Sequence, residues 1–196
     1  MRVIGVTGGV GAGKSTVLSM LKELCNCEIV MADDIAKDMM EPDGGLYQEL
    51  IRIFGDKAYE NGVLNRKYIA EQMYNNDSLK REWTAIVHPA VNSRIFSIID
   101  DAKKAQKVDY VFIEAALLIE NGYDRICDEI WYVFADAGTR IERLQKQRGY
   151  TPEKTGAIMD SQLSDDIFRS KSQFVIDTGH DIESTYNILK NKLSEY

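Results

Sequence analysis

The sequence predicts an α/β fold in which a parallel sheet of five strands is flanked by helices. Short apolar runs alternate along the chain with segments whose apolar residues recur at helical spacing. The runs at residues 108–113 and 130–134 are almost continuously apolar, as is typical of parallel strands covered on both faces. A glycine-rich stretch also joins the first strand to the first helix. Together these observations indicate a doubly wound sheet, whose ligands bind beyond the carboxyl ends of the strands.

The first strand is expected at residues 3–6, and the loop that follows has the composition of a phosphate-binding loop. Gly8 is followed by four residues and then by Gly13-Lys14-Ser15, which is the complete spacing of the P-loop. Glycines allow backbone N–H groups to point at a phosphate, and the helix that follows directs its positive end to the same place. This context favours the P-loop nucleoside-triphosphate hydrolase fold over a turn that only connects two elements.

Individual roles follow from the geometry of such loops. We expect Lys14 to reach the outer phosphates of ATP, and Ser15 to hold Mg²⁺ through its hydroxyl. The whole loop is expected to contact the nucleotide, through Gly9, Val10, Gly11, Ala12, Gly13, Lys14, Ser15 and Thr16.

The second strand, at residues 28–31, is followed by a long block with helical patterns. Helices are expected at 35–40, 46–54 and 66–74, with a loop marked by Gly55, Asn61 and Gly62. A longer helical pattern covers residues 79–99, where Pro89 should break or kink the helix or start a second one. Because the block lies between two strands of the sheet, residues 33–105 are predicted to form a helical insertion that covers substrate.

The remaining strands are expected at residues 108–113, 130–134 and 174–177. Helices should occupy 137–147, a segment capped by Thr151, a short segment from Ser164, and a last one capped by Asp181. The last helix should turn four side chains inward, namely Ile182, Tyr186, Leu189 and Leu193. The predicted domain thus has a core of residues 1–32, 106–136 and 172–196, and a lid over residues 137–171.

Bulk composition restricts the possible functions. The 196 residues, 44% of them hydrophobic, suffice for one domain with a core. The formal net charge of −7 argues against a general nucleic-acid binder. The three cysteines, with no secretory leader expected, indicate reduced thiols and a cytoplasmic location. The longest apolar run is too short to span a membrane. The oligomeric state is left undetermined.

Two functional classes remain for a chain with this loop. The Asn-Lys-x-Asp motif that reads guanine is absent, as is the Leu-Ser-Gly-Gly-Gln signature of transporter ATPases. A small-molecule kinase fits best, because the chain has a helical insertion and a segment rich in arginine. The alternative is a nucleotide-dependent switch protein that hydrolyses its nucleotide slowly.

Further short segments recur in a characteristic order along the chain. They are residues 5–16, 32–33, 35–36, 41–42, 54–55, 61–66, 88–89, 117–120, 162 and 175–177. In this order they resemble the dephospho-CoA kinase family. The resemblance implies transfer of the ATP γ-phosphoryl group to the ribose 3′-hydroxyl of dephospho-CoA, the last step of coenzyme A synthesis. Several positions depart from the usual pattern. Met31 replaces a carboxylate, Glu114 replaces an aspartate, and Thr178 replaces an asparagine. In the lid, Gln147 stands where an arginine is usual, and residues 157–159 lack the arginine that is often found there.

The candidate site residues outside the loop come from several elements. Asp33 follows the second strand and can accept the proton of the acceptor hydroxyl, or it can be a helix N-cap. Glu114 can bind Mg²⁺ through water, or simply end its strand. Arg140, Arg143 and Arg148 are expected to reach ATP phosphates, with Arg143 taking part in catalysis. The expected acceptor contacts are Arg66, His88, Leu117 and Glu120; His88 can equally be a structural histidine.

Overall fold

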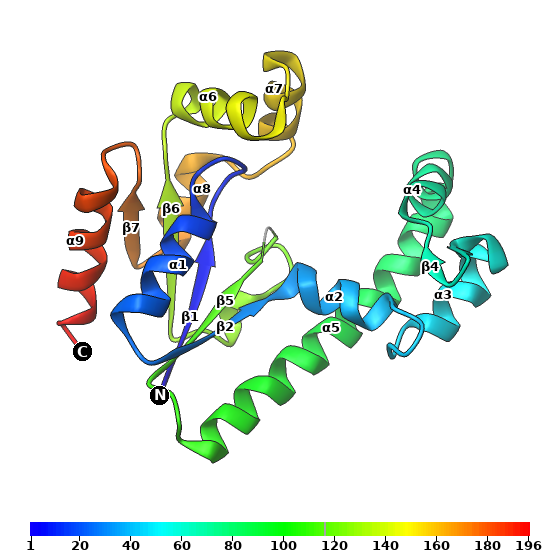
Figure 1. Ribbon diagram of the computed structural model, residues 1–196, viewed down its shortest axis with the longest axis horizontal. Helices are drawn as coiled ribbons and strands as arrows, with labels where there is room; N and C mark the ends of the chain where they lie inside the picture. The colour runs from blue at the N-terminus through cyan, green and yellow to red at the C-terminus, as the bar shows by residue number, and fades with distance from the viewer. Residues whose placement is uncertain (116) are drawn as a thin grey trace. The chain divides into compact units, whose positions relative to one another are not determined.

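The computed structural model describes residues 1–115 and 117–196 (Figure 1). The chain divides into two compact units, each described by itself below. The first unit consists of Met1–Val30 and Ala102–Tyr196, and the second consists of Met31–Asp101. Within the described residues, no helix combines the length and the apolar character that crossing a bilayer requires.

The first unit is built on a five-stranded sheet with the strand order β2-β5-β1-β6-β7. Its strands are β1 (Arg2–Thr7), β2 (Cys27–Met31), β5 (Tyr110–Glu114), β6 (Glu129–Phe134) and β7 (Phe174–Asp177). β1 pairs in parallel with β5 and β6, and β6 pairs in parallel with β7. The predicted five-stranded parallel sheet is therefore confirmed. The carboxyl ends of its strands form one edge, which the loop after β1 shares.

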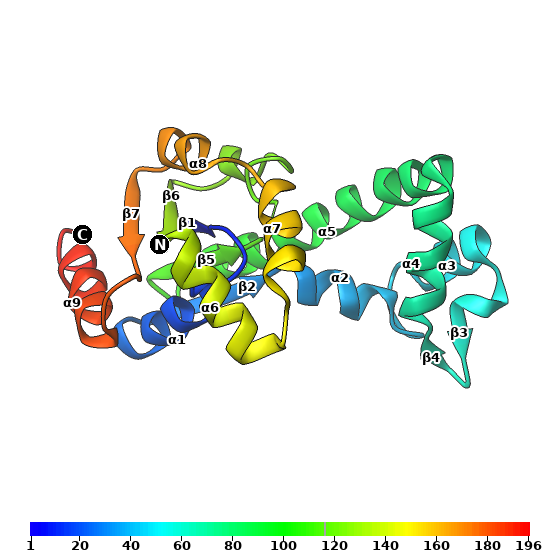
Figure 2. The same ribbon diagram turned by 90° about the horizontal axis from the view of Figure 1, so that it is seen from above.

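Helices cover both faces of this sheet. The helices are α1 (Lys14–Leu24), α6 (Ala137–Arg148), α7 (Pro152–Asp160), α8 (Asp165–Lys171) and α9 (Ile182–Leu193), with a 3-10 turn at Tyr123–Arg125. α1 packs beside α9 on one face, and α8 lies against β6 on the other (Figure 2). The expected N-caps are confirmed: Thr151, Ser164 and Asp181 each accept a hydrogen bond from a backbone N–H three residues later.

The expected inward face of α9 is only partly correct. Leu189 is fully buried, but Ile182 is 71% exposed. Helical spacing identifies which residues share a face, but it does not show where along the helix axis packing begins. The inward face begins one turn later, at Thr185, whose side chain is buried.

The second unit is mainly helical and has its own apolar core. Its elements are α2 (Ala32–Met40), α3 (Tyr47–Phe54), a 3-10 turn (Asp56–Ala58), β3 (Tyr59–Glu60), β4 (Val63–Leu64), α4 (Arg66–Asn75) and most of α5 (Asp77–Ala105). The buried core side chains are Leu46, Leu50, Phe54, Ala58, Leu64, Ile69 and Trp83. Asn61 and Gly62, predicted as part of a loop, form a two-residue hairpin turn between β3 and β4. Their φ angles of 52° and 78° suit a type I′ turn.

Of the three alternatives for Pro89, a helix break and a new helix start are wrong, while a kink stays a prediction. α5 runs through Pro89 as one helix of 29 residues. A proline removes one backbone hydrogen bond, but tertiary packing can offset this cost. Trp83 before the proline and Val91 and Ile95 after it are all buried, so packing holds the helix on both sides of Pro89.

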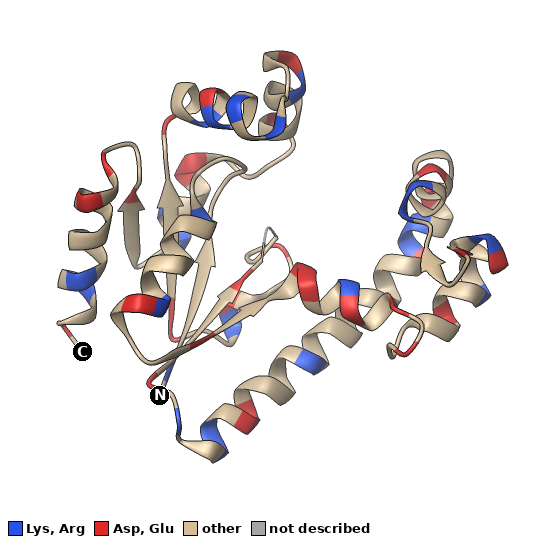
Figure 3. Ribbon diagram, viewed as in Figure 1, with Lys and Arg blue, Asp and Glu red and all other residues tan. Residues whose placement is uncertain are grey.

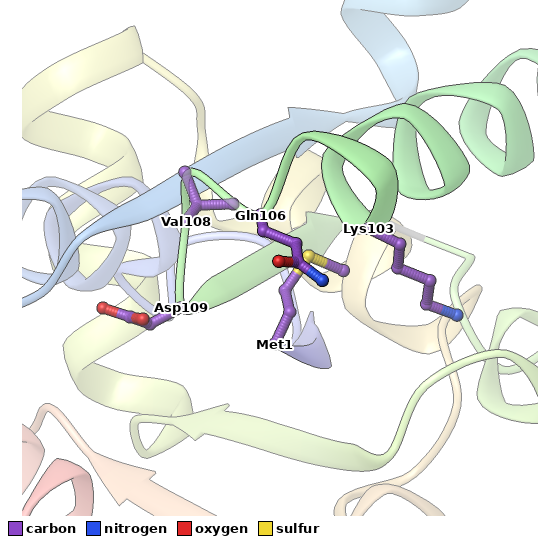
Figure 4. A pocket seen from close by; sticks show the side chains of 5 residues that line it. All are labelled: Met1, Lys103, Gln106, Val108 and Asp109. Carbon is purple, nitrogen blue, oxygen red and sulfur yellow. The ribbon is translucent and has the colours of Figure 1, made fainter.

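A pocket of about 320 Å³ lies at the opposite edge of the sheet from the loop (Figure 4). It is lined by Met1, Lys103, Gln106, Val108 and Asp109, which surround the amino ends of β1 and β5. Ligands of parallel sheets bind beyond the carboxyl ends of strands. The pocket is therefore not part of the candidate site.

Gly8 is a position where the fold requires glycine, because its φ of +151° is unfavourable for other residues and a Cβ would lie 2.3 Å from the Val133 carbonyl oxygen. We expect Gly8→Ala to lower the free energy of unfolding by about 3 kcal/mol or more. Gly156→Ala is the matched control, because a Cβ there meets no atom within 4 Å. As Gly156 is inside α7, its replacement should raise stability by about 0.5–1 kcal/mol. Urea denaturation measures both changes, and equal stability of the two variants would contradict this account.

Candidate active site

The loop between β1 and α1 contains glycines in backbone conformations that other residues rarely adopt. Gly13 is the N-cap of α1 with φ 91°, and Gly11 has φ 78°, so both lie in the left-handed region that glycine tolerates. Gly13 has no side chain that could cap the helix. The first N–H groups of α1 therefore point to the place where a phosphate would bind, with the positive end of the helix dipole behind them.

Lys14 folds back over this loop. Its Nζ donates to the Gly8 carbonyl at 2.8 Å and lies 3.4 Å from the Gly9 carbonyl oxygen. It also lies 3.7 Å from Oε1 of Glu114, which ends β5 and is 7% exposed. The fold thus brings the lysine that begins α1 close to the carboxylate that ends β5, the neighbour of β1. Ser15 and Thr16, the next residues of α1, are exposed.

Arg140 and Gln162 hold the Val10 peptide groups from two sides. Arg140 is buried, and its Nε donates to the Val10 carbonyl at 2.8 Å. Oε1 of Gln162 accepts from the Val10 N–H at 3.0 Å and from Nη2 of Arg140 at 3.1 Å. A Cβ on Gly9 would lie 2.2 Å from Nη2 of Arg140, so glycine at position 9 permits this close approach.

Arg143, one helical turn after Arg140, contacts the end of β7. Its guanidinium donates to Oγ1 of Thr178 at 3.1 Å and to the Thr178 carbonyl at 2.6 Å. The Thr178 hydroxyl in turn donates to the Ala12 carbonyl at 2.7 Å. α6 is rich in Lys and Arg (Figure 3), and two of its arginines thus reach the loop region.

The other predicted residues of the first unit lie differently. Arg148 ends α6, is exposed, and lies 6.0 Å from the centre of the Tyr150 ring. Leu117 is 45% exposed, and Glu120 is exposed in the turns after β5.

Three predicted residues lie in the second unit. Asp33 is the second residue of α2 and is exposed. The alternative interpretation of Asp33 as an N-cap is wrong, because the N-cap is Met31, which has no side-chain cap hydrogen bond. Arg66 begins α4 and pairs with Glu41 at 3.8 Å, and His88 is half-buried in α5.

We also considered the cysteine thiols and groups of metal-ligating side chains as candidate sites. Burial is the main cause that raises the pKa of Cys25 to about 12, which keeps this thiol protonated. Burial also raises the pKa of Cys27, the first residue of β2. In the part of the chain that the structure describes, His, Cys, Asp and Glu form no group of three or more that could hold a metal ion.

Two residues at the loop, Gln162 and Thr178, were not among the predicted site residues. Gln162 belongs to a segment that resembles the kinase family, and Thr178 directly follows the carboxyl end of β7. The position of Thr178 is a physical signal, because residues just beyond the carboxyl ends of parallel strands lie at the edge of the sheet where ligands bind. Neither signal identifies which loop atoms the two side chains contact.

The fold and the site together define a P-loop kinase. Its features are a parallel sheet with this strand order, a phosphate loop after the central strand, and arginines that contact this loop. Residues 2–183 match the family model described as dephospho-CoA kinase. The chain belongs to the dephospho-CoA kinase family, whose members phosphorylate dephospho-CoA in the last step of coenzyme A biosynthesis.

Individual relatives agree with this assignment. A dephospho-CoA kinase of Leifsonia xyli is 35% identical over 95% of this chain and 94% of its own length. One from Symbiobacterium thermophilum is 32% identical over 94% of this chain and 77% of its own length. The crystal structure of TT1252 from Thermus thermophilus has a TM-score of 0.83 at 26% identity, covering 99% of this chain and 97% of that one. Dephospho-CoA kinase from Campylobacter jejuni shares the fold, with a TM-score of 0.74 at 20% identity, over 98% of this chain and 96% of that one.

Proposed function

We propose that this chain transfers the γ-phosphoryl group of ATP to the ribose 3′-hydroxyl of dephospho-CoA, with Lys14, Arg140 and Arg143 acting on the phosphates. The family uses ATP as phosphate donor. The observation that carries the assignment of roles is the convergence of these three cationic side chains on one glycine loop. Catalysis of phosphoryl transfer consists mainly of positioning and charge neutralisation, which such a cluster supplies.

Each cation has a distinct task in this proposal. Lys14 exchanges its contacts with the Gly8 and Gly9 carbonyls for the β- and γ-phosphates when the nucleotide binds. Arg140 fixes the Val10 peptide group, and Arg143 lies beside Gly13, so both bring positive charge to the loop. Arg148, exposed at the end of α6, joins them in the proposed nucleotide site.

Ser15 and Glu114 are the proposed ligands of Mg²⁺. An exposed hydroxyl at the start of α1 and a carboxylate at the end of β5 are the hard oxygen donors that this ion prefers. Mg²⁺ keeps several waters and phosphate oxygens, so two protein groups suffice. When bound, the ion neutralises charge on the β- and γ-phosphates.

The acceptor-binding insertion is proposed on residues 33–105, with Arg66 and His88 as acceptor contacts. Leu117 and Glu120, after β5, are two further proposed acceptor contacts. Asp33 is the proposed general base, because it stands just beyond the carboxyl end of β2, where doubly wound sheets place reacting groups. With its N-cap role excluded, its carboxylate is available to accept the proton of the acceptor hydroxyl. The cytoplasmic location and the lack of a nucleic-acid partner remain predictions from composition.

Steady-state turnover of ATP with and without dephospho-CoA tests this function, with the product identified by mass. Turnover that requires dephospho-CoA and a product heavier by one phosphoryl group would support the proposal. Acceptor-independent slow hydrolysis would support a switch protein instead. Phosphorylation of a different metabolite in a competition assay would identify another small-molecule kinase.

We expect residues 137–171 to act as a lid that exchanges amide hydrogens faster without ligand than with ATP. Two side chains of this segment bond to Val10: Oε1 of Gln162 accepts from its N–H, and Nε of Arg140 donates to its carbonyl. Phosphates bound in the loop would give Arg140 and Arg143 additional charge-assisted hydrogen bonds. These bonds would slow the local opening of residues 137–171. Hydrogen exchange with and without ATP and dephospho-CoA measures this, with α9 as the internal control. Equal protection of residues 137–171 in both conditions would contradict a lid.

A further inference from the structure

The hydroxyl of Thr178 joins three elements at the edge of the loop. It donates to the Ala12 carbonyl at 2.7 Å and accepts from Nη1 of Arg143 at 3.1 Å. The Phe134 carbonyl oxygen, at the end of β6, is also 3.1 Å away, so the single hydroxyl proton goes to the nearer Ala12 carbonyl. Thr178 is 6% exposed, and its own N–H donates to the Phe134 carbonyl at 2.9 Å. The side chain is therefore anchored by the sheet.

The bond to Ala12 orients an N–H group of the loop. A trans peptide is planar, with its C=O and the next N–H pointing in opposite directions. Holding the Ala12 carbonyl toward Thr178 therefore turns the N–H of Gly13 away from Thr178. Gly13 is the N-cap of α1, and its N–H is one of the loop donors available to a phosphate.

The second bond places a positive charge beside the same residue. A Cβ built on Gly13 would lie 3.4 Å from Oγ1 of Thr178 and 3.5 Å from Nη1 of Arg143. Arg143 also donates to the Thr178 carbonyl at 2.6 Å, so two nitrogens of its planar guanidinium form hydrogen bonds with Thr178. Thr178 thus holds the guanidinium next to Gly13.

We propose that Thr178 is a positioning residue for ATP, which acts through the Ala12–Gly13 peptide and through Arg143. The inference rests on the proposed nucleotide role of Arg143. Nothing in the sequence pattern assigns this hydroxyl a task, since the family usually has asparagine at this position.

Thr178→Val tests the inference, because valine keeps the branched shape and removes only the hydroxyl. We expect the KM for ATP to rise about tenfold, the usual effect of losing a hydrogen bond to a charged group. The KM for dephospho-CoA should change by less than about twofold, since its contacts are elsewhere. Thr178→Ser, which retains the hydroxyl, should recover most of the ATP affinity. If Thr178→Val is unfolded at the assay temperature, Thr178→Ala gives the same comparison.

Thr185→Val is the matched control. Thr185 is also buried, and its hydroxyl donates to the carbonyl of Asp181, the N-cap of its own helix. Thr185→Val should alter thermal stability without altering the KM for ATP. If Thr178 had only a structural role, Thr178→Val would likewise change stability and leave the KM for ATP unchanged.

A double-mutant cycle with Arg143→Ala separates the inference from the function on which it rests. If Thr178 acts partly through Arg143, the double variant is less impaired than the product of the single effects. An unchanged KM for ATP in Thr178→Val, beside a raised one in Arg143→Ala, overturns the inference and leaves the proposed function standing. Equal impairment of the valine and serine variants also overturns it. An unchanged KM in Arg143→Ala removes the proposed role of Arg143, and the inference with it.

Discussion

Lys14→Ala is expected to lower kcat/KM for ATP by about 100- to 1000-fold, the range found when one preorganised charge is removed from a transition state. Lys14 is the cation whose Nζ lies within the loop, 2.8 Å from the Gly8 carbonyl oxygen. Its aliphatic stem contributes little to the core, because the buried residues of α1 begin at Val17. The fold should therefore survive the substitution, which thermal unfolding must show in parallel.

Lys22→Ala is the control for charge on the same helix. Lys22 lies exposed in the last turn of α1, far along the helix from the loop. Its loss should change kcat/KM by less than about twofold. Lys14→Met separates charge from length, because methionine is also unbranched but has no cation. Near-normal turnover of folded Lys14→Ala or Lys14→Met at saturating ATP would refute the proposed role of Lys14.

Asp33→Asn is expected to slow phosphoryl transfer by about 100-fold or more, because asparagine cannot take the proton of the acceptor hydroxyl. ATP affinity should stay unchanged, since no loop residue is altered. The structure sharpens this test, because the N-cap of α2 is Met31 and not Asp33. The remaining non-catalytic role of Asp33 is a favourable interaction with the helix dipole in the first turn. Loss of that interaction would lower stability slightly and would leave the rate of phosphoryl transfer unaffected.

Asp34→Asn gives the matched control one residue away. Asp34 is exposed in the same first turn and forms an ion pair with Lys37 on the surface of α2. Both substitutions remove one negative charge from the same helix terminus, so their effects on stability should be similar. Single-turnover phosphorylation of dephospho-CoA, with ATP binding measured by calorimetry, compares their rates. A fall of less than about threefold for Asp33→Asn at unchanged ATP affinity would leave the catalytic role unsupported.

Pro89 and Asn61 show how much a local pattern leaves open. Proline predicts a helix boundary because it lacks an N–H, yet buried residues on both sides hold α5 together through Pro89. Asn61 and Gly62 were assigned to a loop, although Asn-Gly is a strong hairpin signal; the two-residue strands beside them are too short to give an alternating pattern. The continuity of α5 depends on packing contacts, whereas the hairpin pairs residues only three to five positions apart.

The sequence by itself determined the class of fold, the strand segments and the phosphate loop, because these depend on local spacing and on alternation of apolar residues. Loop glycines, caps and buried strands are specified within a few neighbouring positions. Only the tertiary structure decided that Arg140 and Gln162 hold the Val10 peptide groups, and that Thr178 joins Ala12 to Arg143. These contacts link residues 35 to 166 positions apart. Such pairings are set by strand order and helix packing, which no local pattern encodes.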